Sequence, residues 1–103
     1  MEQHPKKRID IVIETPLVER VAALLDRMDV SGYSMMPITA GRGQGRAWTA
    51  DGQIGNAMQM TALACIVDAS VMDAILDAVF DVVSQQIGFV TISDVCVIRR
   101  DRF

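Results

Sequence analysis

Three glycines and two arginines stand within the seven residues 40–46, Ala-Gly-Arg-Gly-Gln-Gly-Arg. Glycine allows neighbouring backbone N–H groups to turn toward one point, and a guanidinium group adds positive charge and paired donors at the same place. The segment therefore predicts a site for phosphate or another small oxyanion, although a hairpin without any ligand has the same composition. The candidate anion residues are Gly41, Arg42, Gly43, Gly45 and Arg46.

Two other segments could contribute to such a site. Gln86-Ile87-Gly88 would let a second stretch of backbone come close to a ligand. The C-terminal Arg99-Arg100-Asp101-Arg102 offers further guanidinium groups, which an oligomer could direct into the loop of a neighbouring subunit. A solvated, frayed chain end explains the same arginines equally well.

Composition limits the classes of protein to which the chain can belong. Its 103 residues are enough for one domain with one core, and half of them are apolar. Ten Lys and Arg against 13 Asp and Glu give a net charge of -3, so no overall field would attract nucleic acid or an anionic membrane. No stretch approaches the roughly 20 apolar residues of a membrane span. We expect a cytoplasmic protein without membrane insertion.

The remaining reactive side chains form no catalytic or metal-binding pattern. Cys65 and Cys96 each lie in an apolar, strand-like run and are expected to be buried free thiols. His4 lies in a polar N-terminal tail, and Asp51 has no obvious companion in the loop. Because no general base stands beside a nucleophile, we expect neither an enzyme nor a metal cofactor.

Hydrophobic periodicity predicts a strand, a helix and a second strand before the glycine-rich loop. Residues 8–14 carry isoleucine at every second position, which is the period of a half-buried strand. Thr15 is expected to cap a helix that has Pro16 at its first position. Apolar residues then recur at helical spacing, at Leu17, Val21, Leu24, Leu25 and Met28. The second strand is expected at 33–39, where Pro37 favours an edge position.

The same elements are expected to follow the loop. A third strand at about 58–67 is apolar on both faces. Ser70 and Asp73 resemble a capping box at the start of a second helix. The apolar side of that helix is expected to be Val71, Ile75, Val79 and Val83. A last extended region spans 87–99, with a bend at Ser93-Asp94.

This order is the split βαβ pattern of an α+β, ferredoxin-like fold, βαββαβ, with both helices on one face of an antiparallel sheet. The other face of the sheet would be bare, yet the third strand is apolar there too. We therefore expect a homo-oligomer that packs sheet to sheet. An RNA-recognition module is disfavoured because the third strand has no aromatic side chain.

Five features in one order and spacing resemble the PII signalling proteins over nearly the full chain. They are Lys7-Arg8-Ile9-Asp10, a helix start near 17–21, Ser31-Gly32, the long glycine-rich loop and Val97-Ile98-Arg99-Arg100. The resemblance implies a single PII-like domain over 1–103, with a flexible tail at 1–7, a T-loop at about 41–57 and an arginine-rich tail at 99–103. It also implies a homotrimer that binds adenine nucleotides in clefts between subunits and engages a target protein through its T-loop.

The resemblance further implies which residues touch the nucleotide. Val12 and Ile66 would offer apolar contacts to adenine. Gly32, Tyr33 and Ser34 would approach from the neighbouring subunit. The base of the T-loop, the short segment after the second helix and the C-terminal arginines would surround the rest of the ligand, through Ala40, Gly41, Arg42, Gly43, Gln44, Gly88, Phe89, Arg99 and Arg100.

The chain departs from typical PII proteins directly after Ile87-Gly88. Those proteins continue with Asp-Gly-Lys, whereas this chain continues with Phe89-Val90 and so lacks the lysine expected beside the terminal phosphates. ADP or AMP is therefore expected in place of ATP with magnesium. These features resemble carboxysome-associated PII-like variants, which implies bicarbonate as a second ligand and control of a carbon transporter or carboxysome-associated protein.

Alternatives stay open from the sequence. Trp48 lies in the middle of the loop, where it could anchor a partner protein or pack against its own subunit. The chain could accordingly be a protein-interaction module that needs no nucleotide. It could also be a nitrogen-regulatory PII protein that responds to ATP and ADP.

Overall fold

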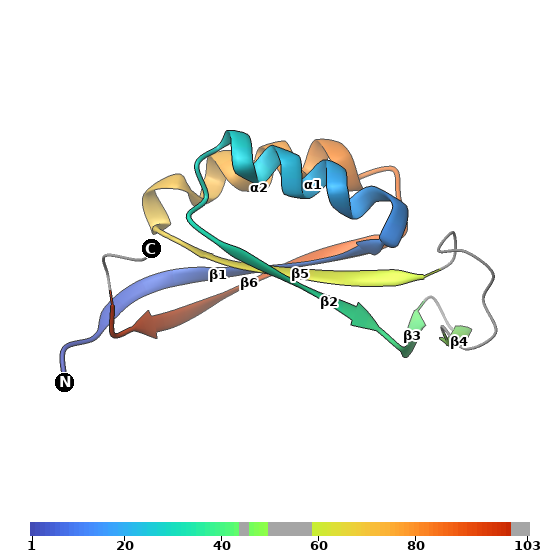
Figure 1. Ribbon diagram of the computed structural model, residues 1–103, viewed down its shortest axis with the longest axis horizontal. Coiled ribbons are helices and arrows are strands. Elements are labelled where there is room, and N and C mark those ends of the chain that lie inside the picture. The colour runs from blue at the N-terminus through green and yellow to red at the C-terminus, as the bar shows by residue number, and fades with distance from the viewer. Residues whose placement is uncertain (44–45, 50–58, 100–103) are drawn as a thin grey trace.

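The computed structural model describes residues 1–43, 46–49 and 59–99 (Figure 1). In chain order the elements are β1 (His4–Glu14), α1 (Thr15–Arg27), β2 (Tyr33–Ile38), β3 (Ala40–Gly43), β4 (Arg46–Thr49), β5 (Met60–Val67), α2 (Ala69–Val83) and β6 (Gly88–Val97). Without the small β3–β4 pair this is the expected βαββαβ order. The α+β, ferredoxin-like fold is therefore confirmed.

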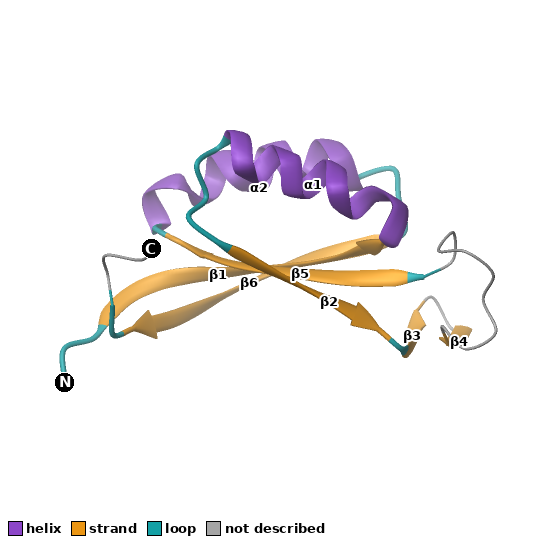
Figure 2. Cartoon of the chain, in the orientation of Figure 1, coloured by secondary structure: helices purple, strands orange, loops and turns teal. Residues whose placement is uncertain are grey.

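Four strands form one antiparallel sheet in the order β2-β5-β1-β6. β5 alternates strictly between buried and partly exposed residues, and β1 does so from Arg8 to Glu14, as its isoleucine repeat predicted. Both helices lie on the same face of this sheet, and the other face is uncovered (Figure 2). Neither described helix is long and apolar enough to cross a membrane.

The core fills the space between the helices and the covered face. Its fully buried side chains are Ile9, Ile11, Ile13, Val21, Leu25, Leu63, Ile75 and Val79. Burying one such side chain stabilises the fold by about 1.5–3 kcal/mol. Val71 was expected on this side, but it is 46% exposed, because the apolar stripe of α2 starts one turn later.

Both expected helix caps are wrong. Glu14 is the N-cap of α1, and the Thr15 hydroxyl instead bonds the Thr61 hydroxyl on β5 at 2.7 Å. Asp68 is the N-cap of α2, without a side-chain capping bond, so Ser70 and Asp73 lie inside the helix. The helix starts earlier than expected because β5 ends at Val67 and the chain turns at once.

The N-terminal tail is shorter than expected. Residues from His4 onward belong to β1, where His4 pairs with Val97 of β6. The pairing of β6 with β1 is unbroken from Gly88 to Val97, so the bend expected at Ser93-Asp94 is absent from this described strand. It also places Cys96 on an edge strand, where its side chain is exposed, while Cys65 is buried as expected.

The glycine-rich loop begins as a second, two-stranded sheet. β3 and β4 pair only with each other, with Gly41 opposite Trp48 and Arg42 opposite Ala47. Figure 1 shows this pair beyond the end of the four-stranded sheet.

Candidate functional site

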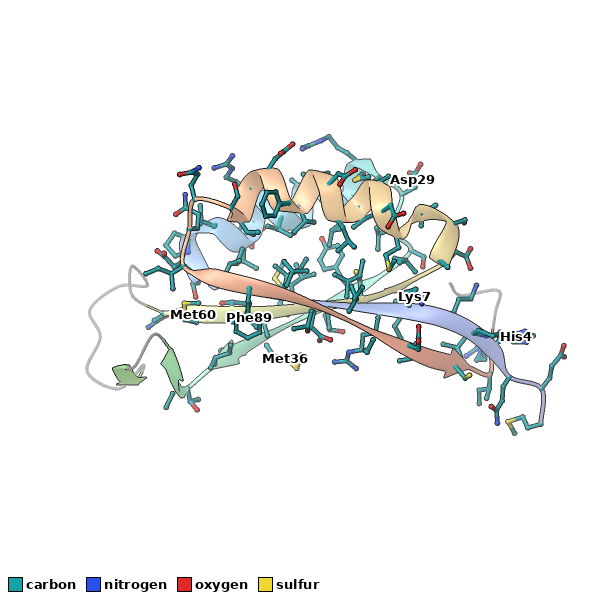
Figure 3. All side chains as sticks on the ribbon, turned by 180° about the vertical axis from the view of Figure 1, so that it is seen from behind. His4, Lys7, Asp29, Met36, Met60 and Phe89 are labelled. Carbon is teal, nitrogen blue, oxygen red and sulfur yellow. The ribbon has the colours of Figure 1, made fainter. Side chains whose placement is uncertain are left out.

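The uncovered face of the sheet carries a row of apolar side chains near the end from which the glycine-rich loop leaves β2. Neighbouring strands place Met36, Ala62, Val12 and Phe89 side by side across all four strands. Met36 is 45% and Phe89 57% exposed. Figure 3 shows Met36, Met60 and Phe89 at one end of the sheet, with His4 and Lys7 at the other.

Gly88 is held by its own subunit at this end. Its φ is +153°, and a Cβ atom there would lie 2.3 Å from the Val12 carbonyl oxygen. Only glycine fits such a close approach between β6 and β1. The shape of the chain around Gly88 thus follows from strand packing, and it positions Phe89 directly beside Val12.

The other predicted ligand residues lie farther along the sheet, in two separate places. Gly32, Tyr33 and Ser34 are at the start of β2, where Tyr33 is level with Ile9 in the middle of β1, whereas Arg99 follows the end of β6, beyond the pairing of Val97 with His4. Strand residues rise about 3.3 Å each, so Tyr33 and the loop base after Ile38 are roughly 17 Å apart. The two predicted halves of the nucleotide site therefore do not meet within one subunit.

Ile66 does not lie beside Val12. It lies opposite Arg8, whereas Val12 lies opposite Ala62, so the two residues share a face but stand two side-chain rows, roughly 13 Å, apart. A ligand that touched both within one subunit would have to pass over Asp10 and Ala64. Their joint contact with adenine stays a prediction.

The described part of the glycine-rich loop is extended. Ala40–Gly43 and Arg46–Thr49 are strands, and consecutive N–H groups of a strand point in opposite directions. A backbone nest for an anion needs turn conformations instead, so an oxyanion at Gly41 to Gly43 would require this backbone to rearrange. Gln44, Gly45 and Arg100 lie outside the described residues. Trp48 belongs to β4, and its role as a partner contact stays a prediction.

An ion pair occupies the middle of the uncovered face. Arg8 donates from Nε to Asp10 Oδ2 at 3.0 Å and from Nη2 to Asp10 Oδ1 at 3.1 Å. The hydrogen bond and charge of Asp10 raise the pKa of Arg8. The sequence analysis used these residues only as part of a family resemblance. The signal in the sequence that could have predicted this ion pair is two opposite charges, Arg8 and Asp10, two positions apart on a predicted strand.

Two further side chains have shifted pKa values. Burial, with a hydrogen bond to Asp26 at 3.4 Å, raises the pKa of the Tyr33 hydroxyl. Burial raises the pKa of the Cys65 thiol to about 11, so this thiol is protonated and unreactive near neutral pH. No group of three potential metal ligands occurs among the described residues.

Two shallow hollows flank β6. One, of about 250 Å³, lies between Lys6 and Cys96, and the other, of about 310 Å³, lies between Phe80 of α2 and Ile92. Neither is lined by a residue predicted to bind nucleotide.

A comparison with protein-family models shows which family the chain belongs to. The model described as nitrogen regulatory protein P-II matches residues 6–102. The chain belongs to the P-II family. Among curated proteins, none matches the sequence significantly.

Solved P-II-like structures share the fold at low sequence identity. CPII of Thiomonas intermedia K12, bound to ADP, AMP and bicarbonate, has a TM-score of 0.89 and 22% identity, covering 99% of this chain and 96% of that chain. A PII-like signalling protein of Thermus thermophilus has a TM-score of 0.83 and 23% identity, covering 100% and 99%. The apo form of CPII has a TM-score of 0.74 and 20% identity, covering 93% and 95%. The expected fold of the single chain is thereby confirmed.

Proposed function

We propose that this protein is a non-catalytic, cytoplasmic P-II-type sensor that binds ADP or AMP between the subunits of a homotrimer. It also binds bicarbonate near the T-loop. The occupied loop would then regulate a transporter or carboxysome-associated protein of inorganic-carbon metabolism. The observation that carries the proposal is the separation of the predicted ligand residues along β2, with Gly32 to Ser34 at its start and the loop base after its end, which a neighbouring subunit would bring together.

Several facts support the choice of ligand. CPII of Thiomonas intermedia, which shares the fold, has been solved with ADP, AMP and bicarbonate. Only four residues, 84–87, connect α2 to β6 in this chain, and none of them is basic. A triphosphate with magnesium would find no lysine there, so a shorter phosphate chain fits better.

Isothermal titration tests the ligand directly. ADP and AMP should bind more tightly than ATP with magnesium. Bicarbonate added to the ADP-saturated protein should release further heat, and chloride at equal ionic strength should not. Acetate in a parallel titration would distinguish bicarbonate from any small carboxylate. Absence of binding for every adenine nucleotide would refute the proposal and favour a nucleotide-independent interaction module.

Mixed subunits test whether the site is shared. Arg42→Ala alters the half-site at the T-loop, and Arg99→Ala alters the half-site at the far end. Each variant alone should lose about tenfold to a hundredfold in ADP affinity, since each loses a charge-assisted hydrogen bond. Arg27→Ala on the exposed last turn of α1 is the matched control.

Random mixing of the two variants should restore tight binding at about a quarter of the interfaces, because one interface in four then combines two unaltered half-sites. A site contained in one subunit would gain nothing from mixing. Light scattering on the unmixed protein should give the mass of a trimer.

A further inference from the structure

The first residues of β1 extend beyond the rest of the sheet. β5 ends at Val67, which pairs with Lys7, so residues 4–6 of β1 have no neighbour on that side among the described strands. On their other side they pair with the last three residues of β6, with His4 opposite Val97. Figure 1 shows the start of β1 and the end of β6 side by side at one end of the sheet. Among the described strands, residues 4–6 are thus the only partner of the end of β6.

Side chains attach this segment to the body of the domain. Lys6 bonds the carboxylate of Asp68 at the N-cap of α2, and the Lys6 side chain is only 10% exposed. Lys7, next to it, bonds Asp94 of β6. Pro5 and Lys6 also line the hollow of about 250 Å³ together with the first residue of α2. A two-stranded ribbon is marginally stable by itself, so these contacts hold the segment and the end of β6 in one conformation.

Arg99 stands two residues after the end of this pairing. A guanidinium binds phosphate best when its paired donors face the phosphate oxygens, so the direction in which the chain leaves β6 affects the contact. Without residues 4–6, the last residue of β6 with a strand partner would be Asp94, five residues before Arg99. The pairing therefore shortens the unpaired chain before Arg99 from five residues to two.

We propose that residues 4–6 are an N-terminal clamp that positions Arg99 for the phosphate groups of the nucleotide. None of the three is a predicted ligand residue, so the clamp acts through β6 and its members are positioning residues. This inference rests on the proposed function, in which Arg99 is a ligand residue.

The length of the unpaired chain sets the expected effect. The effective concentration of a tethered group falls roughly as the −3/2 power of the tether length, so a change from two to five residues lowers it about fourfold. The freed residues must also be ordered when Arg99 binds, which weakens binding further. Loss of the clamp should therefore lower ADP affinity by about fourfold to tenfold.

Removal of residues 2–6 tests the clamp. The shortened chain keeps every fully buried core side chain, of which Ile9 is the first, and it loses one glutamate and one lysine, so its net charge is unchanged. Isothermal titration measures its ADP affinity, and circular dichroism and light scattering check its fold and mass. Removal of residues 2–3, which precede β1, is the matched control and should change ADP affinity by less than about twofold.

The Arg99→Ala variant separates positioning from general stabilisation. Without its guanidinium there is no group for the clamp to position, so removing residues 2–6 from this variant should change ADP affinity by less than about twofold. A segment that only stabilised the fold would lower the affinity by the same factor in both backgrounds.

Two variants of the full chain test the attachment to α2. Lys6→Met removes the ion pair with Asp68 and should lower ADP affinity by about twofold to threefold. Lys6→Arg keeps the positive charge and should bind ADP as wild type does. These two variants decide the question if the shortened chain does not fold.

The proposal is overturned if the folded, shortened chain binds ADP as wild type does, or if removing residues 2–6 lowers the affinity equally with and without the Arg99 guanidinium. Wild-type affinity in Arg99→Ala itself would overturn it as well. If wild type bound no ADP, the proposed function would fail and this inference with it. Tight binding by wild type, with a loss in Arg99→Ala but none in the shortened chain, would remove this inference alone.

Discussion

Gly88→Ala is the sharpest test of how the sheet positions the end where the predicted ligand residues Val12, Gly88 and Phe89 meet. The added Cβ would lie 2.3 Å from the Val12 carbonyl oxygen and 3.2 Å from both Cα and Cγ2 of Ile13. These neighbours belong to the backbone and a buried side chain, so they cannot move aside independently. Relief requires the first residues of β6 to separate from β1.

Two contributions lower the free energy of unfolding of the Gly88→Ala variant. Alanine at a φ of +153° is strained by about 1–3 kcal/mol, and loss of a terminal strand hydrogen bond adds about 1 kcal/mol. We expect the free energy of unfolding to fall by about 2–4 kcal/mol. Urea unfolding followed by circular dichroism measures this, at one fixed subunit concentration because an assembly makes stability depend on concentration.

Gly32→Ala is the control, because a Cβ at Gly32 meets no atom within 4 Å. Its free energy of unfolding should stay within about 0.5 kcal/mol of wild type. If Gly88→Ala lowered the free energy of unfolding as little as Gly32→Ala, the contact with β1 would not require glycine at position 88. The position of Phe89 would then need another explanation.

Three further outcomes follow from burial. Val79→Ala should destabilise the fold by about 2 kcal/mol because Val79 is fully buried, whereas Val71→Ala, at a half-exposed site on the same helix, should change urea stability by less than about 0.5 kcal/mol. A thiol reagent should label Cys96 in the native protein, and Cys65 only after unfolding; equal labelling rates would contradict the described burial. The folded Cys65 thiol has a pKa near 11 against an ordinary value of 9.0, so its contribution is complete below pH 9 and lost as the pH rises toward 11. The stability difference between wild type and Cys65→Ala should therefore decline over that interval, and a constant difference would refute it.

The fold could be predicted from the sequence because its signals are local and repeated. Isoleucine at every second position of β1 and the helical spacing from Leu17 to Leu25 each identify an element without knowledge of its neighbours. The ends of elements were less predictable. The capping roles of Thr15 and Ser70 were wrong because the observed helices start at residues set by the preceding strands.

The candidate site was predictable as residue types but not as an arrangement. Sequence indicated Val12, Gly88 and Phe89, and the strand register brings them together. It could not show that Val12 and Ile66 stand two rows apart, since that depends on the register between β1 and β5. The burial of Cys65 and exposure of Cys96 likewise depend on whether a strand is central or at the edge.

The small β3–β4 sheet gives this part of the loop little stability of its own. A two-stranded sheet that pairs with no other described strand is at most marginally stable in water by itself. A ligand whose affinity differs only a few tenfold between two loop conformations could then change which of them predominates. The rigid sheet beside it would keep its register throughout, so the response to a small molecule can be confined to the one part of the surface that a partner would read.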